Sequence, residues 1–243
     1  LTISEDNKSL IESNITWVTN ESDNYALEEG LQIKELHGGE VVICTLGKEP
    51  ANQILKDALA KGADRGIFLS DAQFDNLDIL SIAKIFCSVL KEEDFDLILS
   101  GLQSDDQGNS QLGLLLAELL QMSHASLVMG TAIIDSKTIK VKRELEDGWF
   151  QWTELDLPAS ISIQSGINTP RYATLKGIMM VKKKPITQIS SNNTEIEGIV
   201  QRVTQQNIYI PEKSKETVML DGSSDEIVEK LIDVFQNDIK VMN

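Results

Sequence analysis

The fold class is decided by residues 96–120, which read DLILSGLQSDDQGNSQLGLLLAELL. Their apolar start, 96–101, is typical of a buried parallel strand, and their leucine-rich end, 114–120, is typical of a helix. Toward the N-terminus the same alternation recurs, with strands predicted at 41–45 and 66–69 and helices at 25–35, 50–62 and 77–90. This alternation predicts a parallel sheet covered by helices on both faces.

After residue 124 the pattern changes to four β-rich runs, at 125–134, 138–145, 149–157 and 159–164. The first three are separated by Asp135-Ser136-Lys137 and Glu146-Asp147-Gly148, which are hairpin signals. We therefore expect antiparallel strands to extend the parallel sheet. Residues 1–187 are assigned to this α/β domain.

Residues 188–243 are interpreted as an extended arm that ends in a helix. Residues 188–216 are polar and weakly patterned, and an amphipathic helix then runs from Ser223 or Ser224 to Phe235. A helix at the end of a polar arm has little local core to pack against. We therefore expect it to dock on another subunit.

The composition excludes several classes of function. With 22 Lys and Arg against 38 Asp and Glu, the net charge is −16, which argues against nucleic acid or an anionic membrane as the main partner. No apolar run approaches the roughly 20 residues of a membrane span, so no membrane insertion is expected. Cys44 and Cys87 lie in apolar runs and are interpreted as buried thiols, which favours a reducing compartment. Two isolated His and the lack of a CxxC motif exclude a Cys/His zinc site, and no set of catalytic residues has a supporting context.

The loop at 100–113 is the first candidate for a binding site, because it follows a parallel strand and precedes a helix. In open α/β sheets ligands bind at this edge, and free backbone N–H groups at a helix start favour a phosphate. Asn109 and Gln111 supply amide donors, whereas Asp105 and Asp106 are expected to hydrogen-bond loop amides or a ribose hydroxyl. The alternative is an ordinary polar loop. The spacing matches neither GxGxxG nor a Walker A motif.

The second candidate is the basic segment 171–184. Arg171, Lys176 and Lys182 to Lys184 flank the apolar residues Leu175, Ile178, Met179 and Met180. A basic patch with apolar anchors suits a partner that carries acidic residues around a hydrophobic pocket. The alternative is a solvated amphipathic helix.

Aromatic residues gather at Trp149, Phe150 and Trp152. Packing in the core or at an interface is the favoured interpretation of this cluster. Stacking on a flavin or adenine ring is the alternative.

Four motifs occur in the order and at the spacing that one protein family shows. Residues 170–179, PRYATLKGIM, closely match the partner-recognition loop of the electron transfer flavoprotein β subunits. Residues 24–29, NYALEE, are similar to that family's E-x-A-x-E-E helix start, and 101–113 are similar to its nucleotide loop. Residues 58–66, ALAKGADRG, are also typical of the family. The chain thus resembles the β (small) subunit of the electron transfer flavoproteins.

The resemblance implies a Rossmann-like, adenine nucleotide alpha hydrolase-like fold that pairs with an alpha subunit. Such a heterodimer holds FAD, mostly on the alpha subunit, and carries electrons from acyl-CoA dehydrogenases of fatty acid β-oxidation and related flavin dehydrogenases to a quinone oxidoreductase. The β chain binds an AMP with a structural role. It is an electron-carrier subunit without catalytic residues of its own.

The resemblance also implies which residues bind. The nucleotide contacts would be Asn20, Leu46, Gly47, Gln103, Asp106, Asn109, Ser110, Gln111 and Leu112. The dehydrogenase would dock on Arg171, Tyr172, Leu175, Ile178, Met179 and Lys183, with Leu175 as the apolar anchor. The chain departs from the family at two of these places. The family's Asn-Pro-Phe-Asp/Cys-Glu motif reads Asn20-Glu21-Ser22-Asp23-Asn24 in this chain, and the Thr that usually precedes the last Gly of the nucleotide loop is Leu112.

Two further expectations concern the first strand of the family's fold and the cellular compartment. The family's chain opens with a buried strand ahead of the matching residues, so we expect the domain at 1–187 to lack that strand. A bacterial or archaeal cytoplasm is expected, or a mitochondrial matrix if the source is eukaryotic.

Two alternatives to this function stay open. One is the bifurcating branch of the family, with a second FAD and NADH, and the other is a stand-alone adenine-nucleotide-binding regulatory module.

Overall fold

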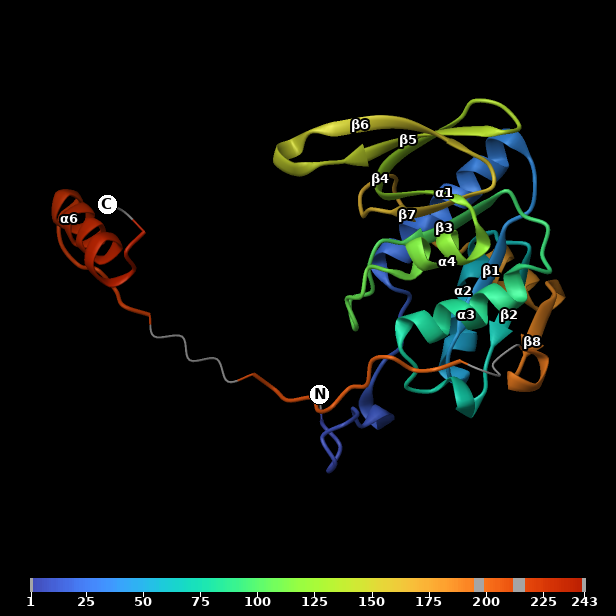
Figure 1. Ribbon diagram of the computed structural model, residues 1–243, viewed down its shortest axis with the longest axis horizontal. Coiled ribbons are helices and arrows are strands. Elements are labelled where there is room, and N and C mark those ends of the chain that lie inside the picture. The colour runs from blue at the N-terminus through green and yellow to red at the C-terminus, as the bar shows by residue number, and fades with distance from the viewer. Residues whose placement is uncertain (1, 195–198, 212–216, 242–243) are drawn as a thin grey trace. The chain divides into compact units, whose positions relative to one another are not determined.

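The computed structural model describes residues 2–194, 199–211 and 217–241. The chain divides into two units, of which the first is Ile11–Gln206 and the second is Thr2–Leu10 with Asn207–Asn243. The first unit contains every strand of the two sheets described below. Figure 1 shows the elements of each unit.

A three-stranded parallel sheet forms one part of the first unit. It has the order β1-β2-β8, with β1 at Val42–Leu46, β2 at Arg65–Leu69 and β8 at Ile186–Ile189. Helix α2, Glu49–Lys61, joins β1 to β2, and α3, Ile79–Leu90, follows β2. β8 crosses the predicted boundary at residue 187, and the first unit extends to Gln206. Within it, Ile199 packs against a core cluster.

A five-stranded mixed sheet forms the other part, in the order β3-β7-β4-β5-β6. Its strands are β3 (Leu97–Gly101), β4 (Ser123–Ile133), β5 (Thr138–Glu144), β6 (Phe150–Asp156) and β7 (Ala159–Ile163). β7 pairs in parallel with β3 and β4, whereas β4, β5 and β6 are antiparallel. The predicted α/β class with added antiparallel strands is confirmed. The single sheet that we expected is two sheets in the described residues, with β1 and β3 each at an edge.

Two helices cover the five-stranded sheet on opposite faces (Figure 1). They are α1, Glu21–His37, and α4, Leu112–Leu120. The sequence Ala-Ser-Ile-Ser-Ile of β7 explains the arrangement, because alternate side chains of a strand point to opposite faces. Ile161 and Ile163 pack in one core cluster with Ala26 of α1. The serines face α4, where Ser160 Oγ donates to the carbonyl oxygen of Gly113 at 2.8 Å.

Short 3₁₀ turns lie at Glu12–Asn14, Ala72–Phe74, Glu146–Gly148, Val181–Lys183 and Ser191–Asn193. Cys44 and Cys87 are free thiols that pack partly buried against one core cluster. Burial, with a smaller contribution from the charge of Glu93, raises the pKa of the Cys44 thiol to about 12, and burial raises that of Cys87 to about 11. Both thiols therefore remain protonated at neutral pH. No described helix is long and apolar enough to cross a bilayer.

The second unit contains α6, Ser224–Asp233, followed by a π turn at Val234–Asp238. Ser223 and Glu226 form a capping box at its start, which confirms the predicted N-cap. Of the apolar residues of this helical segment, Val228, Leu231 and Ile232 are exposed and Ile227 and Phe235 are half-buried. Parts of the predicted arm, at 195–198 and 212–216, and the terminal residues 242–243 lie outside the described residues.

Gly113 provides a test of the packing between α4 and the sheet. A Cβ at Gly113 would lie 2.4 Å from Ser162 Oγ and 2.6 Å from Ser100 Oγ. We expect Gly113→Ala to destabilise the chain by about 1–3 kcal/mol, because it overpacks a buried contact. Denaturant unfolding measures the change.

Gly30→Ala is the matched control, because Gly30 lies in α1 and the nearest atom outside that helix, Leu99 Cδ1, would be 3.4 Å from the added carbon. Its stability should be unchanged or slightly raised, since Ala favours a helix interior. Equal destabilisation by the two variants would contradict the close approach at Gly113.

Candidate functional site

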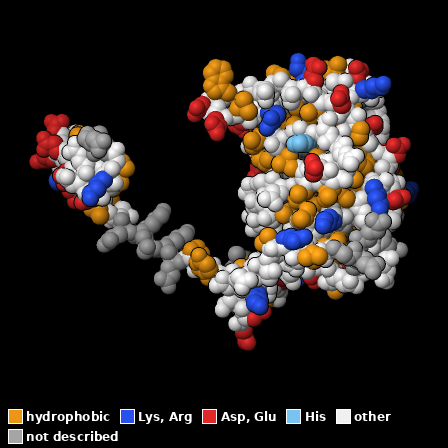
Figure 2. Space-filling view, in the orientation of Figure 1, with side chains coloured by type: hydrophobic (Ala, Val, Ile, Leu, Met, Phe, Trp, Pro, Cys, Tyr) orange, Lys and Arg blue, Asp and Glu red, His pale blue; other side chains and the backbone are white. Residues whose placement is uncertain are grey.

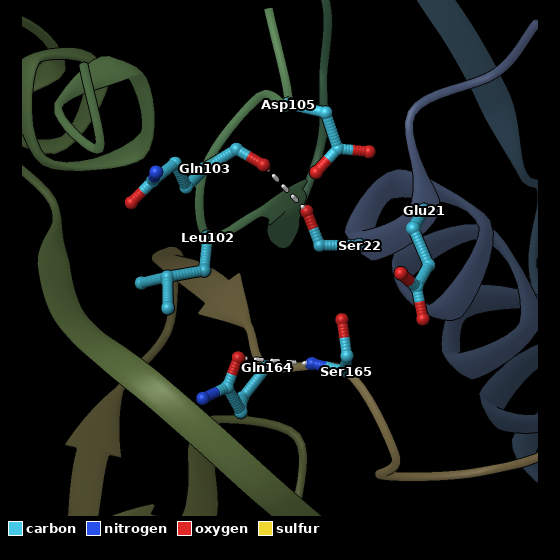
Figure 3. Close-up of a pocket in the computed structure, with 7 residues that line it drawn as sticks. All are labelled: Glu21, Ser22, Leu102, Gln103, Asp105, Gln164 and Ser165. Atoms are coloured by element: carbon cyan, nitrogen blue, oxygen red, sulfur yellow. Dashed lines mark hydrogen bonds between the residues drawn. The ribbon is translucent and has the colours of Figure 1, made fainter. Parts of the chain in front are cut away.

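The start of α1 is bonded to the loop that follows β3. Asn20, the N-cap of α1, donates from Nδ2 to the carbonyl oxygen of Gln103 at 2.9 Å and accepts from the Asp105 amide at 3.0 Å. Ser22 Oγ donates to the same Gln103 oxygen at 2.9 Å (Figure 3). Asp23 accepts from the Gly101 amide at 2.8 Å. The first turn of α1 therefore fixes the course of the loop.

Gly101 permits this contact. A Cβ there would lie 2.4 Å from Ser22 Oγ and 2.8 Å from the Asp23 backbone nitrogen. A larger residue would push α1 away from the carboxyl end of β3.

An open cavity of about 300 Å³ lies beside this junction. Figure 3 shows side chains from three places around it: the start of α1, the loop after β3 and the end of β7. The lining residues are Glu21, Ser22, Leu102, Gln103, Asp105, Gln164 and Ser165. Of the nucleotide contacts that the resemblance implies, Gln103 lies among them and Asn20 flanks them. Asp105, which was expected to bond loop amides or a ribose hydroxyl, also lines the cavity.

Sequence reasoning missed Gln164 and Ser165 as site residues. They follow β7 directly, at the same edge of the sheet as the loop after β3. The edge rule for parallel strands identifies both residues once β7 is known to be parallel to β3, but the sequence favoured an antiparallel strand there.

The rest of the predicted nucleotide loop is bonded within itself. Ser110 Oγ donates to Gln103 Oε1 at 2.6 Å, and Asn109 Nδ2 donates to Gln107 Oε1 at 3.2 Å. Asp106 accepts from the Gln107 amide at 2.7 Å, which confirms the prediction that it hydrogen-bonds a loop amide. These internal hydrogen bonds add to those that the loop makes with α1.

The loop ends at the start of α4. Gln111 is the N-cap, Leu112 is the first helical residue, and the Gln111 side chain makes no capping hydrogen bond. The first N–H groups of α4 are thus left without a side-chain cap from Gln111. Such groups attract an anion at a helix start.

The predicted contacts at the end of β1, Leu46 and Gly47, do not line the cavity. Leu46 packs against the same core cluster as Leu112, so the end of β1 and the start of α4 border one hydrophobic region. The Gly47 amide donates to the Leu69 carbonyl oxygen at 3.0 Å. A Cβ at Gly47 would lie 2.9 Å from Ala51 Cβ, so this glycine lets α2 begin close to the sheet.

The predicted docking segment forms a short helix, α5, at Leu175–Met180. Thr174 caps it, because its Oγ1 accepts from the Gly177 amide at 3.0 Å. The predicted apolar contacts are exposed, with Tyr172 at 92% and Leu175 at 76%, and Ile178, Met179 and the cation Lys183 are also exposed. Arg171 differs, because its guanidinium is paired within the chain to Glu28 and Glu35 of α1.

The aromatic cluster of the β5–β6 hairpin is also exposed. Trp149, Phe150 and Trp152 lie on the surface, and Figure 2 shows hydrophobic and acidic side chains at the tip of this hairpin. Of the predicted packing in the core or at an interface, this exposure leaves the interface. Interface packing and the alternative of stacking on a flavin or adenine ring both stay predictions. Among the described residues no group of three or more His, Cys, Asp and Glu side chains could hold a metal ion.

Comparison with known proteins decides the family. A family model described as "Electron transfer flavoprotein domain" matches residues 8–193. The chain is 34% identical over 241 residues to the electron transfer flavoprotein subunit beta of Methylophilus methylotrophus, covering 96% of this chain and 90% of that protein. The chain belongs to the electron transfer flavoprotein β-subunit family.

Two further relatives cover a smaller share of this chain. The electron transfer flavoprotein subunit beta of Bacillus subtilis is 31% identical over 229 residues, which are 93% of this chain and 88% of that protein. The caffeyl-CoA reductase-Etf complex subunit CarD of Acetobacterium woodii is 34% identical over 181 residues, which are 74% of this chain and 68% of that protein.

A substitution of Asn20 tests how the loop after β3 is held. In Asn20→Ala we expect the Asp105 amide to exchange with solvent faster, with about 0.5–1.5 kcal/mol less protection, because its hydrogen-bond acceptor is lost. Hydrogen exchange read on a millisecond to second scale measures it. Asn24→Ala is the matched control on the same helix, since the Asn24 side chain contacts Asn20 O and Lys61 rather than the loop. Unchanged exchange in Asn20→Ala would show that the loop does not depend on α1.

Proposed function

We propose that this chain is the β subunit of a heterodimeric electron transfer flavoprotein. It carries electrons, with its alpha subunit, from acyl-CoA and related flavin dehydrogenases to a quinone oxidoreductase. The observation that carries the proposal is the match to a β subunit over 90% of that relative's length. The exposed apolar loop at α5 supports it, because that loop offers a surface to a further protein.

The proposed cofactors are FAD, shared with the alpha subunit, and AMP. FAD supplies the redox chemistry when bound, whereas this chain supplies binding and orientation. The cavity volume of about 300 Å³ is at the lower end for small-molecule sites. Glu21 and Asp105 of the cavity lining can accept hydrogen bonds from ribose hydroxyl groups. The N–H groups at the start of α4, which does not line this cavity, favour a phosphate. Both features support a nucleoside monophosphate as the proposed ligand. The proposed contacts remain Asn20, Leu46, Gly47, Gln103, Asp106, Asn109, Ser110, Gln111 and Leu112.

The proposed docking surface is the loop from Arg171 to Lys183, with Leu175 as its apolar anchor. Exposed Lys side chains around an exposed Leu favour a partner with acidic residues around a hydrophobic pocket. The proposed location is a reducing compartment, a bacterial or archaeal cytoplasm or a mitochondrial matrix. The two free thiols support it.

The nucleotide content of the purified heterodimer tests the cofactor proposal. Denaturation should release one FAD and one AMP per heterodimer, measured by chromatography of the supernatant. The similarity to the CarD subunit favours a second candidate, a bifurcating carrier, and two FAD without AMP would establish it. A stable homodimer or monomer that never co-purifies with an alpha subunit would instead support a regulatory module.

Leu175→Ala tests the docking proposal. Loss of an anchoring side chain should raise the KM of a dehydrogenase for the carrier by roughly 30-fold, as expected for a hot spot of about 2 kcal/mol. Steady-state kinetics with the variant heterodimer measure it, while FAD content and thermal stability should not change. Leu36→Ala is the matched control, since Leu36 is equally exposed, at 79%, on α1. Loss of flavin or stability in Leu175→Ala would indicate a structural role.

A further inference from the structure

Arg171 stands at the start of the docking loop, yet its guanidinium faces α1. Nε and Nη2 donate to the two carboxylate oxygens of Glu28 at 2.8 and 2.9 Å, and the Arg171 amide donates to Glu28 at 3.2 Å. Nη1 and Nη2 also donate to Glu35. Glu28 is 4% exposed. A bidentate pair with a buried carboxylate is among the strongest polar contacts that a side chain makes. We call these three residues the Arg171 clamp.

The charges of the clamp are stable at neutral pH. Burial alone would raise the pKa of Glu28, but hydrogen bonds from Arg171 and Gln32 hold it below the ordinary value. A hydrogen bond from Arg171 lowers the pKa of Glu35. Both carboxylates therefore stay ionised, and the guanidinium has little capacity left for a carboxylate of another protein.

The other end of the loop is held on α2. Lys184 Nζ donates to the carbonyl oxygens of Leu59 and Ala63 at 2.8 and 2.5 Å, at the end of that helix. Between the two ends, α5 lies so close to α2 that a Cβ added at Gly177 would be 2.1 Å from the Ala60 carbonyl oxygen. The loop is thus attached to two helices before any partner binds.

The cations of the loop therefore fall into two groups. Arg171 and Lys184 are bonded to the domain itself. Lys176, Lys182 and Lys183 are exposed and take part in none of the ion pairs found among the described residues. Only the second group is placed to meet a partner's carboxylates.

We propose that Arg171 is a positioning residue, which with Glu28 and Glu35 fixes the docking loop on α1 so that Leu175 is presented in one place. The inference rests on the proposed docking function of the loop. Fixing the loop in advance lowers the conformational entropy that docking would otherwise cost, so the clamp strengthens binding without touching the partner.

The experiment compares heterodimers carrying Arg171→Gln, Arg171→Lys, Glu28→Gln and Lys183→Gln. The first readout is tryptic cleavage after Lys176 and Lys182 without any dehydrogenase present. Arg171→Gln and Glu28→Gln should both speed this cleavage by about tenfold, since a loosened loop is cut faster. Lys183→Gln should leave cleavage after Lys176 unchanged.

The second readout is the KM of a dehydrogenase for the carrier as salt is varied. Arg171→Gln and Glu28→Gln should raise KM by about tenfold with kcat unchanged and the salt dependence retained, and the double variant should be no worse than either alone. Arg171→Lys should not restore KM, because Lys keeps the charge but loses the bidentate geometry. Lys183→Gln should raise KM and weaken the salt dependence, as removal of a partner-facing charge does.

Two results would overturn the inference. In the first, Arg171→Lys restores KM, Arg171→Gln weakens the salt dependence as Lys183→Gln does, and cleavage is unchanged, which makes Arg171 a partner contact. In the second, Leu175→Ala leaves KM unchanged, so the docking function itself fails, and cleavage still reports whether the clamp holds the loop. Should Arg171→Gln fold poorly, Glu35→Gln removes the exposed half of the clamp and should give the same changes at reduced size.

Discussion

The packing of β7 between α1 and α4 is the contact on which the rest of the structure depends. All five residues of β7 are buried, and their alternation separates two kinds of surface. Ile161 and Ile163 face α1, where apolar area is removed from water, and Ser160 faces α4, where a small hydroxyl allows Gly113 to approach. The strand thereby fixes both helices, and each helix brings one part of the candidate site to the same edge of the sheet.

α1 supports both functional regions at once. Its first turn holds the loop after β3 through Asn20 and Ser22, and further along the helix Glu28 and Glu35 hold the proposed docking loop. A single helix of 17 residues therefore connects the cavity to the proposed docking segment. A displacement of α1 would alter both regions, which gives a physical route by which packing changes at β7 reach either site.

The sequence predicted the elements whose signal is local, such as β3, α4 and the Ser223 cap. It missed what depends on distant partners. Predicted from residue 25, α1 begins at Glu21, because its first turn is held by a loop more than 80 positions away in sequence. β8 is a four-residue strand in a polar stretch, and its pairing with β2 defines it. The inward role of Arg171 depends on Glu28, 143 positions away.

The acidic composition gains a structural meaning from α1. As a net charge of −16 it argued only against polyanionic partners. Within α1, however, the carboxylates have specific tasks: Glu28 and Glu35 bind Arg171, and Glu29 accepts from Thr131 and Asn168. These bonds join α1 to Thr131 of β4 and to Asn168 and Arg171 in the segment that follows β7. Part of the negative charge therefore holds segments of the domain together. Because Glu28 and Glu35 pair with Arg171, the outward-facing cations of the proposed docking loop are its exposed lysines.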